Sequence, residues 1–199
     1  VCLTIVSGAT LFLLVEWQMV HSILILGMVC TIVYSLPLWP IPAIQSLHRF
    51  GLAKTLLLSF TWTLVLHAWP FGTLREAFQF PYYWYFIGRF CFLLLLCILF
   101  DARDVRVDRE RSFRSLATDL PVYWMHILSL LAVLGFGFAM HQFLRTEPVA
   151  HQYPVVIGTV LALAVLYRMS FRQRGYYFYY FGVDGMLLLN ALASFLVIG

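Results

Sequence analysis

Three aspartates at a regular spacing are the residues best suited to chemistry in this chain. Asp101, Asp104 and Asp108 directly follow an apolar stretch at residues 93–100. At about 100° per residue, the spacing i, i+3, i+7 places them on one face of a helix, within roughly 60° of each other. Carboxylates on one face repel each other unless a cation or basic partners accompany them. Mg²⁺ is such a cation, because it binds through one or two carboxylates plus substrate phosphates.

Basic residues follow the aspartates closely. Arg109, Arg111 and Arg114 would suit phosphate oxygens, because a guanidinium binds two of them at once. The same stretch also fits a solvated, salt-bridged loop whose arginines mark one side of a membrane. The spacing alone leaves both interpretations open.

The composition determines what kind of protein must position these residues. Of the 199 residues, 62% are hydrophobic and 11% are charged, and the mean hydropathy is +0.87. Soluble domains carry roughly a quarter of charged residues, so a soluble enzyme, a disordered tail and a small secreted module are excluded. The sequence predicts an integral membrane protein. In a membrane protein, the net charge of +4 does not indicate nucleic-acid binding. What matters is how the charged residues are distributed among the loops.

Seven segments approach the roughly 20 apolar residues that a membrane-spanning helix needs. We expect an all-α, polytopic transmembrane bundle that forms a single domain over residues 1–199. Because the chain starts at Val1 in an apolar segment, we also expect an N-terminal portion to be missing. The predicted spans are 1–15, 19–36, 52–69, 83–100, 121–140, 154–169 and 177–198.

The basic residues predict the orientation of this bundle. The loops after the second, fourth and sixth spans carry ten of the thirteen basic residues, whereas the opposite side carries only Arg75 and Arg145. Cytoplasmic loops are enriched in Lys and Arg. The aspartate-rich loop is therefore expected in the cytoplasm.

Residues 101–117 resemble the second aspartate-rich motif of the UbiA superfamily of intramembrane prenyltransferases, D-x-x-D-x-x-x-D-x-x-x-G-[IL]-[KR]-[ST]-L-[AP]. The three aspartates match its acidic positions, and residues 114–117 (Arg-Ser-Leu-Ala) match its tail. Ser112 and Phe113 depart from the family's glycine and aliphatic residue.

The predicted topology agrees with this resemblance. The family has nine helices, with this motif in the cytoplasmic loop between the sixth and seventh. Four predicted spans precede the motif here and three follow it, so the resemblance implies helices three to nine. The family's first motif, N-D-x-x-D-x-x-x-D, would lie upstream of Val1. The local sequence resembles that of a poorly characterised bacterial subgroup of the family. This resemblance implies that the protein lies in a bacterial inner membrane.

The resemblance implies Mg²⁺-dependent transfer of a polyprenyl group from an isoprenyl diphosphate to a lipophilic, often aromatic, acceptor. Asp104 and Asp108 would be the catalytic core, and Asp101 would complete the metal ligands. The residues that the family pattern places near the diphosphate are Tyr34, Arg49, Lys54 and Arg114. Lys54 also fits a simple positive-inside anchor, and that interpretation stays open.

Three other classes of protein were weighed. A non-catalytic UbiA-like membrane protein that binds lipid or a partner remains the alternative. A CDP-alcohol phosphotransferase does not fit, because no glycine follows Asp101 and no Ala-Arg follows Gly185. A retinal-type receptor does not fit either, because the last predicted span has no lysine.

Two charged residues fall inside predicted spans. A charge at the bilayer centre costs roughly 2.5–3.5 kcal/mol on insertion scales. We therefore expect Arg89 and Asp184 to face the bundle interior or a cavity, and we consider that they pair with each other.

Overall fold

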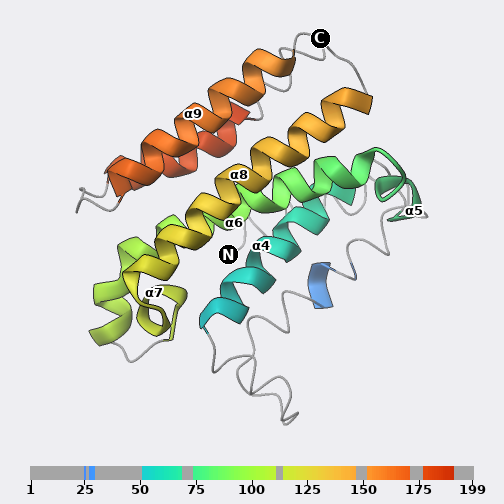
Figure 1. The fold of residues 1–199 in the computed structure, drawn as a ribbon. Helices are drawn as coiled ribbons and strands as arrows, with labels where there is room; N and C mark the ends of the chain where they lie inside the picture. Colours follow the sequence, from blue (N-terminus) through green and yellow to red (C-terminus); the bar gives the residue numbers. More distant parts are fainter. Residues whose placement is uncertain are drawn as a thin grey trace.

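The computed structural model describes residues 25, 27–29, 51–68, 74–110, 114–146, 152–170 and 177–190. All regular elements among these residues are helices (Figure 1). The predicted span at 1–15 lies outside the described residues. So does the span at 19–36, apart from four helical residues.

The helices follow one another with short connections. Residues 184–190 continue the π-helix η2 as α-helix. The elements are α4 (Gly51–Ala68), α5 (Leu74–Ala77), α6 (Tyr82–Glu110), α7 (Leu116–Asp119), α8 (Val122–Thr146), α9 (Gln152–Ser170) and η2 (Phe178–Val183).

Three of these helices are long and apolar enough to cross a membrane. They cover Tyr82–Val105, Val122–Thr146 and Tyr153–Ser170, and they confirm the spans predicted at 83–100, 121–140 and 154–169. The segment predicted at 52–69 is helical as α4, and a shorter apolar helix, Phe181–Asn190, lies within the segment predicted at 177–198. These helices indicate a membrane protein.

Helix α6 extends beyond its apolar part. The stretch treated above as a loop is helical as far as Glu110, so α6 has 29 residues and a length of about 43 Å. The hydrocarbon core of a bilayer is about 30 Å thick. The end of α6 that carries the three aspartates can therefore extend past the apolar layer.

Helix α6 lies at the centre of the packing. It contacts α4 on one side and α8 on the other, and α8 also packs against α9 (Figure 1). Leu95 and Leu99 of α6 are fully buried in the main core, together with Leu163 of α9 and Val183 of η2. This packing fixes how α6 is rotated, and so which of its side chains face α4.

A smaller core holds the short helix α7 beside the aspartates. Leu116 and Ala117 of α7 are buried against Ile98 of α6 and Met125 of α8. The Ser115 amide also donates to the Thr118 hydroxyl at 2.8 Å, which supports the start of α7. The start of α7 is thus held against the aspartate-bearing end of α6.

Candidate functional site

A polar pocket of about 500 Å³ lies between the N-terminus of α4, the last turns of α6 and the residues before α7. The structure brings five predicted site residues together around it: all three aspartates, Lys54 and Arg114. The pocket is lined by Gly51, Lys54, Thr55, Leu58, Cys97, Phe100, Asp101, Asp104, Asp108, Arg114 and Ser115.

Asp101 is bound from two neighbouring elements. The Thr55 hydroxyl of α4 donates to its Oδ2 at 2.6 Å. The backbone amide of Leu116, at the start of α7, is a second donor to the same carboxylate. These bonds fix the side chain where α4, α6 and α7 meet.

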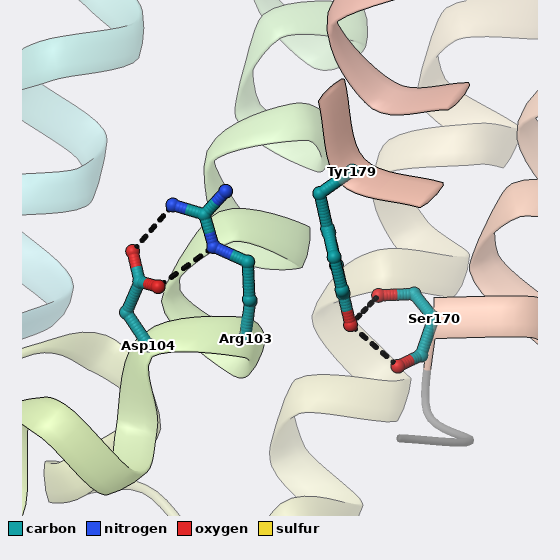
Figure 2. A network of polar contacts seen from close by, with 4 residues as sticks. All are labelled: Arg103, Asp104, Ser170 and Tyr179. Carbon is teal, nitrogen blue, oxygen red and sulfur yellow. Dashed lines mark hydrogen bonds and ion pairs between the residues drawn. The ribbon is translucent and has the colours of Figure 1, made fainter. Parts of the chain in front are cut away.

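Asp104 is bound by its neighbour on the same helix. Arg103 donates from Nε to Oδ1 at 2.7 Å and from a terminal nitrogen to Oδ2 at 2.8 Å (Figure 2). Both carboxylate oxygens therefore accept from one guanidinium, the strongest geometry for such a pair. No pattern in the sequence singles out Arg103 as a partner of Asp104, because a neighbour at i+1 on a helix does not normally share its face.

The remaining charged side chains of the pocket are Lys54, Asp108 and Arg114. The Lys54 ammonium donates to the Arg114 carbonyl at 3.3 Å, so the two predicted diphosphate ligands are adjacent. Arg114 is exposed and Asp108 is half-buried. Tyr34 and Arg49, the other predicted diphosphate ligands, lie outside the described residues, as do Ser112 and Phe113.

Two residues that sequence reasoning missed bring α4 to the pocket. The Gly51 amide donates to Asp119 Oδ2 at 2.6 Å, which satisfies a free N–H at the start of α4. A Cβ on Gly51 would lie 2.1 Å from the carbonyl carbon of Ser115, so only glycine permits this approach. The partners are 68 residues apart, and no local signal in one sequence reveals such a pair.

An apolar pocket of about 570 Å³ adjoins the polar one. Leu58, Cys97 and Phe100 line both pockets, so the two meet along α4 and α6. The apolar pocket continues past Trp62 and Leu93 toward the opposite end of these helices. Its other lining residues are Leu66, Arg89, Phe92, Leu96, Leu187 and Asn190.

Arg89 faces this apolar pocket, and no ion pair joins it to Asp184 in the described part of the chain. Arg89 donates to the Tyr85 hydroxyl at 2.8 Å and to the Leu66 carbonyl at 3.2 Å, near the end of α4. Asp184 is exposed, and its charge acts on Arg103 instead. Arg89 therefore satisfies a terminal carbonyl of α4.

The donor chemistry of the polar pocket was compared with the needs of Mg²⁺. Within the described part of the chain, no three His, Cys, Asp or Glu side chains are grouped closely enough to hold a metal ion by themselves. Mg²⁺ does not need such a cage, because one or two carboxylates plus substrate phosphates suffice. The oxygens of Asp101, Asp104 and Asp108, with Lys54 and Arg114 nearby, fit that mode of binding.

Together, these features define a helical membrane protein with a charged pocket joined to an apolar one. No known protein family matches the chain, and no curated protein or solved structure is significantly similar to it.

Proposed function

We propose that this protein is a Mg²⁺-dependent intramembrane prenyltransferase of the UbiA type. It would transfer a polyprenyl group from an isoprenyl diphosphate to a lipophilic acceptor. The observation that carries this proposal is that the polar and the apolar pocket share Leu58, Cys97 and Phe100. An isoprenyl diphosphate has the same two parts, an anionic head and an apolar tail, joined directly.

The charged residues have separate roles in this proposal. Asp101, Asp104 and Asp108 would hold Mg²⁺, which when bound makes the diphosphate a better leaving group. Lys54 and Arg114 neutralise charge on the departing diphosphate. The bond from the allylic carbon to the diphosphate oxygen breaks, and its electron pair leaves with the diphosphate. The acceptor then forms a bond to that carbon and loses a proton.

The proposal also includes the predicted environment. The aspartate-bearing end of α6 would face the cytoplasm of a bacterial inner membrane, in the orientation that the distribution of basic residues predicts. Tyr34 and Arg49 would complete the diphosphate ligands. The nine-helix family architecture would surround the described helices.

A non-catalytic UbiA-like protein that binds lipid or a partner is the second candidate. It is favoured by the contacts of two carboxylates, since Asp101 is bonded to Thr55 and Asp104 to Arg103. Such a protein would bind the amphiphile without breaking its carbon–oxygen bond.

The test is Mg²⁺-dependent release of diphosphate from geranylgeranyl diphosphate by the purified protein in detergent, with a native lipid extract as the source of acceptors. Asp104→Asn should lower the release about 100-fold or more, because it removes a charge that acts on the reacting centre. Its melting temperature should stay close to that of the wild type. Glu110→Gln is the matched control, since Glu110 is exposed on the same helix and does not line the pocket.

The two candidates give different results in this test. Binding of geranylgeranyl diphosphate without any release would favour the non-catalytic protein. Release that is unchanged in Asp104→Asn would remove this carboxylate from the mechanism. A wild-type protein that neither binds nor cleaves the diphosphate would overturn the proposal.

A further inference from the structure

Arg103 is a charged residue that the proposed function leaves without a role. It lies between the carboxylate of Asp104 and the ring of Tyr179 (Figure 2). Its side chain is 29% exposed, although it sits at the aspartate-bearing end of α6. It therefore contacts the polar pocket only through Asp104, because Arg103 itself does not line that pocket.

Two aromatic rings hold the guanidinium in this place. Its central carbon lies 5.0 Å from the ring centre of Phe100 and 5.5 Å from that of Tyr179. Cations are attracted to the faces of aromatic rings at such distances. The Arg103 side chain is therefore held by the rings as well as by Asp104.

The Tyr179 ring is itself fixed by α9. Its hydroxyl donates to the Ser170 carbonyl at 3.0 Å and lies 3.4 Å from the Ser170 hydroxyl (Figure 2). The Tyr179 side chain is only 3% exposed. Tyr179 belongs to the π-helix η2, and short π-helical segments are frequent at functional sites.

We propose that Arg103 is a built-in counter-cation of Asp104, which a metal ion or a diphosphate–metal complex must displace to bind this carboxylate. The inference rests on the proposed function in that it takes Asp104 to be a cation ligand. Both oxygens of Asp104 accept from Arg103, so an incoming cation competes with the guanidinium for them. Arg103 is thus a positioning residue that acts through Asp104 and lowers the affinity of the pocket for metal.

The test measures binding of Mn²⁺ alone, as a spectroscopic substitute for Mg²⁺, by electron paramagnetic resonance on the purified protein. Arg103→Ala should bind Mn²⁺ about two- to fivefold more tightly than the wild type, which is the range expected for a partly exposed ion pair. Arg103→Lys should fall between the two, because an ammonium cannot bond both carboxylate oxygens in this fork geometry.

Two further variants separate displacement from a general effect of charge. Arg168→Ala removes an exposed arginine near the end of α9 and should leave Mn²⁺ affinity unchanged. In an Asp104→Asn background, Arg103→Ala should have no effect, because the carboxylate for which both cations compete is gone. If Arg103→Ala still raises the Mn²⁺ affinity in the Asp104→Asn background, the inference is overturned.

The remaining outcomes distinguish the inference from the proposed function. If the wild type binds Mn²⁺ and Arg103→Ala binds it equally well or more weakly, the counter-cation role is wrong and the proposed function stands. If the wild type binds Mn²⁺ neither alone nor with inorganic diphosphate, both are wrong.

Discussion

The two ends of α4 are held by charged side chains of opposite sign, and a polar pocket lies at the N-terminal end. At the N-terminus, Asp119 accepts from the Gly51 amide. At the other end, Arg89 donates to the Leu66 carbonyl. Each charge is favourable there, because a helix carries partial positive charge at its N-terminus and partial negative charge at its C-terminus.

The surroundings of the two ends differ. Near the C-terminus of α4, the buried ring of His67 contacts the rings of Phe78, Tyr85 and Phe86. Aromatic rings thus pack at this end of α4, and the pocket that Arg89 lines is apolar. At the N-terminus, the space beside the helix end is a pocket lined by charged groups that the helix end itself does not require. A helix end that needs only capping can be bordered by apolar side chains, whereas surplus charge beside a pocket indicates a site for a charged ligand.

The largest effect on stability is expected from Gly51→Ala, which disrupts the packing at the N-terminus of α4. The new Cβ would overlap the backbone of Ser115, so α4 and α7 must separate. We expect a loss of about 1–3 kcal/mol or more in the free energy of unfolding. The measurement is thermal denaturation of the purified protein in detergent.

Gly158→Ala is the matched control for this substitution. Nothing lies within 4 Å of a Cβ built at Gly158 in α9. Because alanine favours helices more than glycine does, this variant should equal the wild type or exceed it by up to about 1 kcal/mol. Equal stability of Gly51→Ala and the wild type would show that α4 does not pack on Ser115 as described.

A smaller effect is expected from Thr55→Val, which keeps the shape of the side chain and removes the hydroxyl bonded to Asp101. Hydrogen bonds to charged groups contribute about 1.5–3 kcal/mol. We therefore expect Mg²⁺-dependent diphosphate release to fall about tenfold, since the carboxylate loses a fixing contact.

Thr61→Val tests whether this effect belongs to the pocket. The hydroxyl of Thr61 donates to the Leu57 carbonyl within α4, and Thr61 does not line the polar pocket. Release by this variant should match that of the wild type. A similar fall in both variants would mean that the loss reflects α4 as a whole and not the contact with Asp101.

Local patterns predicted the parts of this structure that depend on neighbouring residues. The lengths of the apolar segments predicted the long helices, and the spacing of the aspartates predicted their common helix in α6. The approach of Lys54 to these aspartates followed only from the family resemblance, because the spacing of one sequence contains no distance between α4 and α6.

Contacts that depend on how helices are rotated against each other could not be predicted. Gly51 and Asp119 meet because a buried cluster seats α7 beside α4, and neither residue stands out in the sequence. The Arg89–Asp184 pair is absent from the described contacts for a different reason. Asp184 acts on Arg103, which lies about 21 Å from Arg89 along α6, so the two charges lie at different levels of the helices.

The smallest expected effect is the coupling energy between Arg89 and Asp184 in the free energy of unfolding. Arg89 interacts with Tyr85 and Leu66, whereas the charge of Asp184 acts on Arg103. Since the two residues share no contact, the losses of stability in Arg89→Ala and Asp184→Ala should add in the double variant to within about 0.5 kcal/mol. A coupling of 1 kcal/mol or more, measured by denaturation in detergent, would mean that these charges interact directly. Arg89 would then neutralise Asp184 across the apolar pocket, and the C-terminal end of α4 would no longer be a simple helix cap.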